Sequence, residues 1–193
     1  MFVMIDPPAI EPVDVALAKA WLRVDHDAED ALITALIETA RRSVEAATGR
    51  CLVETGWTYS LRNAFAAPTI VLPKSPVLAV ASIAYVDLAE EDQTVDQFVI
   101  AEGLDGVTSL RPTSAAGWWP SAAPDSLVTV TFTAGYVTAA AVADLPAELK
   151  TAVLMTMADL YENRQSAVYG SGSFAPVPVG AMDLVANHVR VVL

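Results

Sequence analysis

The sequence predicts an α+β fold in which helices from both ends of the chain pack together, with an inserted antiparallel β-sheet or small β-sandwich and an extended C-terminal arm. Apolar residues recur at helical spacing between residues 14 and 49 and again between residues 146 and 163. Between these stretches the apolar period changes to two, and proline and glycine separate short runs. We therefore divide the 193 residues into a helical part (1–50), a β module (51–145), a long helix (146–165) and a linker with a docking arm (166–193).

The first predicted helix covers residues 15–22 and follows a proline-rich lead. Asp14 is its expected N-cap, because a short carboxylate side chain accepts a hydrogen bond from the amides of the first turn. The apolar residues of this helix, Trp21 among them, are expected to face inward.

A longer helix is predicted to follow the turn at residues 25–30. Asp27 is its expected N-cap, with Asp30 at the third position in an arrangement close to a capping box. Gly49 is expected to end the helix, because glycine adopts the left-handed conformation of a C-terminal cap at little cost. The apolar stripe consists of Ile33, Leu36, Ile37, Ala40, Val44 and Ala47.

Residues 51–145 contain six predicted short strands. In the first strand Trp57, Tyr59 and Leu61 alternate with polar neighbours, which is typical of a half-buried strand. Cys51, the only cysteine, is expected to be a small, semi-buried apolar residue at the start of this module. The other predicted strands lie at residues 69–72, 80–86, 97–100, 107–111 and 127–133.

The helix predicted over residues 146–165 presents one apolar face. Pro146 and Glu148 favour its first turn. Another element must cover the apolar face, which consists of Leu149, Val153, Met157 and Leu160. Residues 166–180, rich in glycine and proline, are expected to be a tether. The apolar residues 181–193 that follow are expected to dock on a partner.

The formal net charge of −12 is concentrated in the middle of the chain, where residues 51–145 hold ten of the 23 acidic and three of the 11 basic residues. Such a surface argues against gripping DNA, because neutralising phosphates requires clustered lysine and arginine. It suits a wall along which a duplex slides without sticking, since repulsion keeps the polyanion away. The alternative is that the charge only provides solubility. The candidates for such a wall are Glu90, Glu91, Asp92 and Asp96.

The residue types present give little support for an enzyme. The chain has two histidines and one cysteine, and His188 is isolated. The carboxylates of residues 25–30 resemble a metal nest, but helix capping accounts for them and no further histidine or cysteine cluster supplies ligands. We therefore expect no catalytic residue, no metal and no cofactor. The sequence also has no signal-peptide pattern and no membrane-spanning run, which predicts synthesis in the cytoplasm.

Trp118 and Trp119, followed by Pro120, form the most conspicuous aromatic feature. Two exposed tryptophans in a loop can form a platform for a sugar or a peptide. They can equally cap the open end of the β module, with the second tryptophan, Trp119, left open for a contact with another subunit. The platform interpretation gives the alternative function, a monomeric carbohydrate- or peptide-binding module.

Four segments in order carry a family resemblance. Residues 13–50 are similar to an opening pair of helices, and residues 72–87 (LPKSPVLAVASIAYVD) to middle strands. Residues 133–136 (TAGY) end a strand, and the helix over residues 148–164 begins with ELKTA and ends with LYENR. Together these segments resemble the head-tail connector, or adaptor, family of tailed bacteriophages and phage-derived gene transfer agents.

The resemblance implies a non-enzymatic structural protein that forms a ring of about twelve copies below a portal protein. The ring would join the portal to a stopper or tail terminator protein and let double-stranded DNA pass without specific binding. Incorporation in the particle neck would follow synthesis in the bacterial host, with no membrane involved. Trp118 and Trp119 would contact a neighbouring subunit. The arm is expected to dock on the portal through Val177, Val179, Met182, Leu184, Val185, Val189 and Val191.

Overall fold

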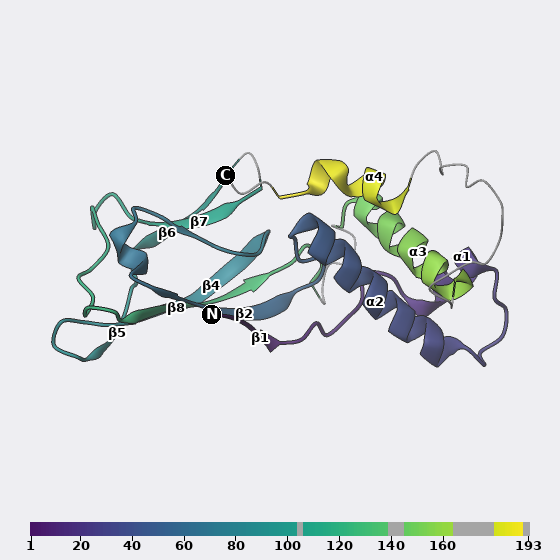
Figure 1. Cartoon of the computed structure of the whole chain (residues 1–193), viewed down its shortest axis with the longest axis horizontal. Coiled ribbons are helices and arrows are strands. Elements are labelled where there is room, and N and C mark those ends of the chain that lie inside the picture. Colours follow the sequence, from purple (N-terminus) through teal and green to yellow (C-terminus); the bar gives the residue numbers. More distant parts are fainter. Residues whose placement is uncertain (104–105, 139–144, 164–179, 191–193) are drawn as a thin grey trace, which may run out of the picture.

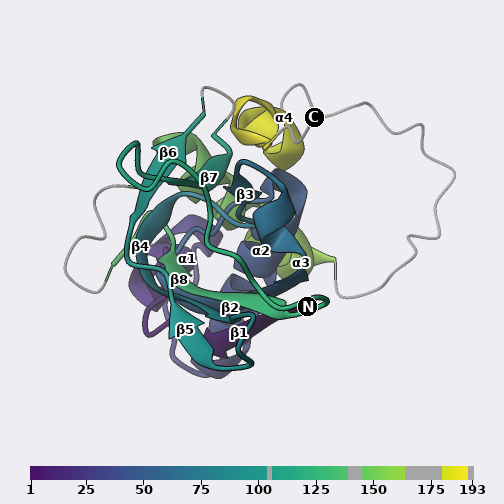
Figure 2. The same cartoon turned by 90° about the vertical axis from the view of Figure 1, so that its left-hand side faces the viewer.

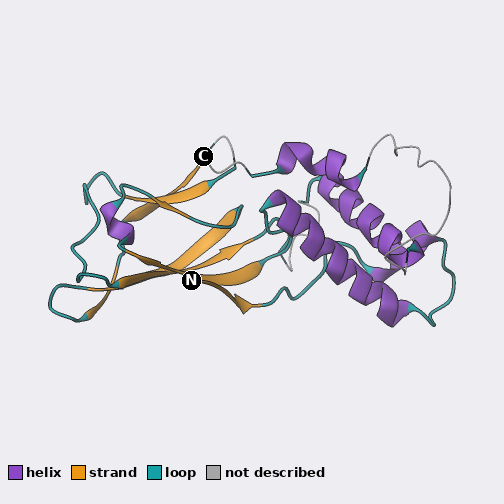
Figure 3. Ribbon diagram, viewed as in Figure 1, coloured by secondary structure: helices purple, strands orange, loops and turns teal. Residues whose placement is uncertain are grey.

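Helices and strands occupy opposite ends of an elongated molecule (Figures 1 and 3). The computed structural model describes residues 1–103, 106–138, 145–163 and 180–190. The helices are α1 (Val15–Leu22), α2 (Asp30–Thr48), α3 (Ala147–Glu162) and α4 (Ala181–Val185). The strands form two antiparallel sheets. The predicted α+β class with antiparallel pairing is therefore confirmed.

The larger sheet has the strand order β1-β2-β8-β4-β5. Its members are β1 (Phe2–Asp6), β2 (Thr55–Arg62), β8 (Leu127–Ala134), β4 (Val77–Val86) and β5 (Asp92–Thr94). The smaller sheet has the order β3-β7-β6, with β3 (Ile70–Val71), β7 (Thr108–Pro112) and β6 (Phe98–Glu102). The sequence did not predict β1 and β5, because neither shows alternation: β1 begins with four apolar residues and β5 has only three residues.

Two of the three predicted helix caps are confirmed. The amide of Leu17 donates to Asp14 Oδ1 at 2.6 Å, and Gly49 has a φ of +70° at the end of α2. The predicted Asp27 cap is wrong, because α2 begins only at Asp30. Lys19 of α1 instead attracts both carboxylates, with its Nζ 2.5 Å from Asp27 Oδ1 and 2.9 Å from Asp30 Oδ1. This hydrogen bond from Lys19 lowers the pKa of Asp27.

The helical core forms between α2, α3 and the start of the β module. The apolar faces of α2 and α3 meet through residues such as Ile37 and Leu149, both fully buried. Three residues predicted to lie on covered apolar faces do not, because Trp21 is 46% exposed, Leu160 is 36% exposed and Ala47 is also exposed. Helical spacing locates the apolar face of a helix but not its limits.

A second core lies between the two sheets. The fully buried side chains of Phe132, Ile83 and Leu110 form its centre. Cys51 is more deeply placed than predicted, at 1% exposure, and burial raises the pKa of its thiol to about 12. This thiol is therefore protonated and inert at neutral pH.

The C-terminal segment differs from the extended arm that the sequence predicted. Residues 181–188 form α4 and a 3-10 turn, η3 (Ala186–His188), which pack beside α3 (Figures 1 and 2). Val185 is 1% exposed and belongs to the helical core. The physical reason is that α3 leaves an apolar surface uncovered by α2, and a short apolar helix lowers the free energy by covering it. The tether predicted at residues 166–180 lies outside the described residues except for Gly180.

Candidate interaction surfaces

The β4–β5 hairpin carries the predicted acidic residues at the end of the molecule farthest from the helices (Figure 1). Asp87 organises its turn: Oδ1 accepts hydrogen bonds from the amides of Ala89 (2.8 Å) and Glu91 (3.1 Å), and Oδ2 accepts one from Gln93 Nε2 (3.1 Å). These bonds, that from the Glu91 amide first, lower the pKa of Asp87. This acid is therefore structural as well as solvated.

The four acids singled out in the sequence are all exposed. Glu90, Glu91 and Asp92 lie together at the hairpin, and Asp96 lies between β5 and β6. Within the described part of the chain, none of the four has an ion-pair partner. The hairpin is thus a solvated acidic tip, and its placement along a DNA channel stays a prediction.

The two tryptophans of the loop between β7 and β8 have opposite environments. Trp119 is 4% exposed and stacks on Phe65 with ring centroids 5.3 Å apart and planes 15° apart. Trp118 is 57% exposed. The prediction that Trp119 is the open tryptophan is therefore wrong, and Trp118 takes that place. The stack on Phe65 buries Trp119, whereas Trp118 lies in a bend where its amide donates a hydrogen bond to the carbonyl of Ala116 at 2.9 Å.

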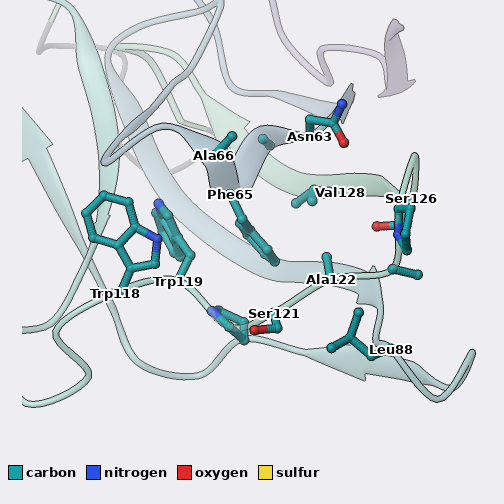
Figure 4. Close-up of a pocket in the computed structure, with 14 residues that line it drawn as sticks. Asn63, Phe65, Ala66, Leu88, Trp118, Trp119, Ser121, Ala122, Ser126 and Val128 are labelled. Atoms are coloured by element: carbon teal, nitrogen blue, oxygen red, sulfur yellow. The ribbon is translucent and has the colours of Figure 1, made fainter.

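A groove of about 540 Å³ lies beside this loop (Figure 4). Within the described residues, two buried polar atoms of its lining, Trp119 Nε1 and Ser126 Oγ, have no hydrogen-bond partner. Phe65 and Leu88 come to the groove from segments far from the tryptophans, so sequence spacing could not indicate them. The groove is suited to an aromatic or apolar side chain of a protein partner. Its main lining residues are Phe65, Leu88, Trp118, Trp119, Ser126 and Val128.

Arginines fasten the C-terminal segment to the body of the protein. Arg50 Nε donates to the carbonyl oxygen of His188 at 2.6 Å, and its Nη1 donates to the Tyr136 hydroxyl at 2.7 Å. The amide of Arg190 donates to the carbonyl of Thr48 at 2.8 Å, and its guanidinium donates to the carbonyl of Leu72. The segment therefore bridges the helices and the β module. No local pattern in the sequence indicates these bonds, because each joins residues far apart in the chain.

The predicted docking residues of the arm fall into three groups. Met182 and Val189 are exposed, at 46% and 42%, and Leu184 is half-buried. Val185 faces the chain's own core, so it is not offered to a partner in this conformation. Three further residues, Val177, Val179 and Val191, lie outside the described residues. Contact of the arm with a portal protein stays a prediction.

The residues considered for chemistry are engaged elsewhere. Lys19 forms ion pairs with Asp27 and Asp30 in the turn at residues 25–30. His188 Nε2 lies 3.8 Å from Glu148 Oε2. Among the described residues, no group of three histidine, cysteine or acidic side chains is placed to hold a metal ion. The same residues include no helix that is both long and apolar enough to cross a membrane.

Comparison with known proteins identifies relatives of this fold. Residues 13–103 match the family of phage gp6-like head-tail connector proteins. No curated protein sequence matches the chain. Similar solved structures include a chain from the virion of a native gene transfer agent particle, with 24% identity, a TM-score of 0.82, and coverage of 100% of this chain and 97% of that chain.

Two further similar chains come from necks of gene transfer agent particles. One is from an empty particle computed with C6 symmetry, with 23% identity, a TM-score of 0.81, and coverage of 100% of this chain and 97% of that chain. The other is from a native particle computed with C12 symmetry, with 23% identity, a TM-score of 0.74, and coverage of 99% and 97%. These likenesses extend over the helices, both sheets and the C-terminal segment, and the sequence match covers α1 to β6. Residues 13–103 are therefore similar to the phage gp6-like head-tail connector family, and the whole chain shares the fold of these gene transfer agent chains.

Proposed function

We propose that this protein is a structural adaptor in the neck of a tailed phage, prophage or gene transfer agent particle, where about twelve copies form a ring. The ring joins the portal protein to a stopper or tail terminator protein, and double-stranded DNA passes through it. The observation that carries the proposal is the connector-family match over residues 13–103. The whole-chain likeness to chains from particle necks computed with C6 and C12 symmetry supports the ring.

The two-ended shape suits a protein that joins two different partners (Figure 3). The helical end carries the C-terminal segment, whose exposed Met182 and Val189 are the described residues best placed to contact the portal. The opposite end carries the acidic hairpin and the Trp118 groove, which we assign to the stopper side and to contact with a neighbouring subunit. Two distinct ends let one ring bind two partners without competition between them.

Passage of DNA would account for the exposed acids of the hairpin, which have no ion-pair partner among the described residues. A duplex in a neck must move at high speed during delivery, so a wall that repels phosphate leaves no ion pairs to break. Glu90, Glu91, Asp92 and Asp96 would then line or face the channel. No residue is assigned a catalytic role, a cofactor or a metal. The protein would be made in the cytoplasm of the host bacterium and incorporated in the particle neck.

Electron microscopy of the purified protein, with and without its portal protein, tests this function. We expect rings with a central channel at least when the portal protein is present. A double variant, Met182→Ser with Val189→Ser, should fold normally because both side chains are exposed, yet should leave portals unoccupied. Leu32→Ser is the matched control, because Leu32 is 38% exposed on α2. A protein that stays monomeric with and without the portal would refute the adaptor function.

A further inference from the structure

Within the described residues the larger sheet has unpaired backbone at β1 and along part of β4, and we propose that β1 of one copy of this chain pairs antiparallel with β4 of a second copy. The inference rests on the ring proposed above and names the contact that joins neighbouring subunits. In this contact the larger sheet continues from one subunit into the next, with backbone hydrogen bonds between β1 of one copy and β4 of its neighbour.

The β1 edge offers backbone groups to a partner. Met1 and Ser60 exchange two backbone hydrogen bonds, of 2.6 and 2.8 Å, and are therefore a hydrogen-bonded pair of the β1–β2 ladder. Such pairs alternate in an antiparallel ladder, so Phe2 and Met4, which lie opposite Tyr59 and Trp57, direct their N–H and C=O groups away from β2.

The β1 edge also lacks the features that usually protect an edge strand. Val3, Met4 and Ile5 are 39%, 40% and 48% exposed. Soluble proteins commonly place lysine, proline or a covering element at such an edge. Residues 2–5 contain neither charge nor proline, and a run of exposed apolar residues at an open edge marks a site of strand addition.

Among the described residues, no strand pairs with the β4 edge over residues 78–82. β5 pairs with β4 only between Ala84 and Val86, and the amide of Val95 extends the contact to the carbonyl of Ile83. Leu78 is 42% exposed, and Ala79 and Ala81 are also exposed. Residues 78–82 are uncharged, and β1 carries a charge only at its last residue, Asp6. The uncharged part of β1, residues 2–5, can therefore meet this edge without burying an unpaired charge.

The strand directions decide how two copies fit. β1 is antiparallel to β2, β2 to β8, and β8 to β4, so β1 and β4 run in opposite directions on the two sides of the sheet. A strand added antiparallel to β4 consequently runs in the direction of β1. A head-to-tail neighbour supplies its β1 in that direction, and the same contact repeats around a ring. Pairing of β1 with another β1 would instead close after two copies.

The register of β4 explains why this contact would form only in the assembly. Its ladder with β8 shifts between Val77 and Ala79 and between Val80 and Ser82. Bulges of this kind weaken the pairing capacity of an edge. Subunits gathered on a portal reach a high local concentration, at which a weak pairing becomes occupied.

Paired cysteines in the full chain test the contact. Val3→Cys combined with Ala79→Cys, or with Ala81→Cys, places one thiol at each edge, and native Cys51 is buried out of reach. After assembly on the portal and oxidation, we expect at least one pair to give a covalent ladder that extends beyond the dimer. Val3→Cys alone, and Val3→Cys combined with Leu32→Cys, should give no ladder. Dimers from Val3→Cys alone, or a ladder only in the Leu32 pair, would overturn the proposal.

Charge substitutions give an independent readout. Met4→Lys and Ala81→Lys should each reduce ring occupancy on the portal by about tenfold or more, because each places a charge at an uncharged edge. Combining Met4→Lys with Ala81→Glu should restore occupancy, and Leu32→Lys should leave it unchanged. Normal rings from both lysine variants would refute the β1–β4 contact and leave the adaptor function intact. Absence of rings from the wild-type protein would refute both.

Discussion

Arg50 Nε donates a hydrogen bond of 2.6 Å to the carbonyl oxygen of His188, which joins residues 138 positions apart. The same guanidinium binds the Tyr136 hydroxyl at the end of β8. One side chain therefore links the end of α2, the end of the sheet and the C-terminal segment. Arg50 therefore contributes to the junction between the helices and the β module.

Arg50→Ala should loosen the C-terminal segment. The variant leaves the carbonyl of His188 and the hydroxyl of Tyr136 without their charged donor, which we expect to lower the free energy of unfolding by about 1.5–3 kcal/mol. In this variant, amide hydrogen exchange should be accelerated more in α4 than in α2, each compared with the wild-type protein. Arg111→Ala, at an exposed position of β7, is the control and should change stability little. Equal exchange rates in α4 of both variants would show that Arg50 does not hold the segment.

Adjacent arginines on α2 should differ sharply in their contribution to stability. Arg41 is 2% exposed, with Nε 2.7 Å from Glu11 Oε2 and Nη1 2.9 Å from Glu45 Oε2. Arg41→Ala leaves two carboxylates without their cation and should cost about 3–5 kcal/mol. Arg42 pairs with Glu38 in solvent, so Arg42→Ala should cost about 0.5 kcal/mol or less. Urea denaturation of both variants measures the difference, and similar midpoints would contradict it.

The acidic tip should tolerate charge reversal. Replacing Glu90, Glu91 and Asp92 by lysine changes the net charge from −12 to −6, since each reversal adds two charges. Each site is exposed, so we expect a stability change below about 0.5 kcal/mol per substitution in thermal unfolding. Binding to a DNA duplex at about 0.15 M salt should rise in the variant and be absent in the wild-type protein. Tight DNA binding by the wild-type protein would contradict the hypothesis that DNA slides along an acidic channel wall.

Asp87 should make the hairpin sensitive to acid. Its pKa is lowered in the folded protein, so its stabilising effect is present above the ordinary value of 3.8 and is lost as the pH falls through the lower folded value. NMR titration of the Glu91 amide should report this loss below pH 3.8, when the carboxylate acceptor is protonated. In Asp87→Asn the same amide should show no such titration step. A step that persists in the variant would assign it to another acid.

The two tryptophans should separate folding from assembly. Trp119→Ala removes a buried, stacked ring and should lower the free energy of unfolding by about 3–5 kcal/mol. Trp118→Ala should leave thermal unfolding nearly unchanged and instead reduce ring or stopper attachment, because Trp118 is exposed. A glycan array should give no ligand for the wild-type protein. A micromolar glycan lost in Trp118→Ala would favour the binding-module interpretation.

Local signals in the sequence determined much of the helical part. The cap at Asp14, the stop at Gly49 and the apolar face of α3 depend on residues within a few positions of one another, and their physics is local. Four short segments in order were also enough to indicate the connector family, which the match over residues 13–103 bears out.

Tertiary structure alone decided which residues are available to partners. Lys19 drew Asp27 away from the start of α2, because a full charge at 2.5 Å competes with a backbone amide. Stacking on Phe65 buries Trp119, and Trp118 stays exposed. Val185 entered the chain's own core because α3 had apolar surface to cover. Strands β1 and β5 exist only through their pairing with β2 and β4, since backbone hydrogen bonds between strands depend on neighbours in space, which neither composition nor periodicity encodes.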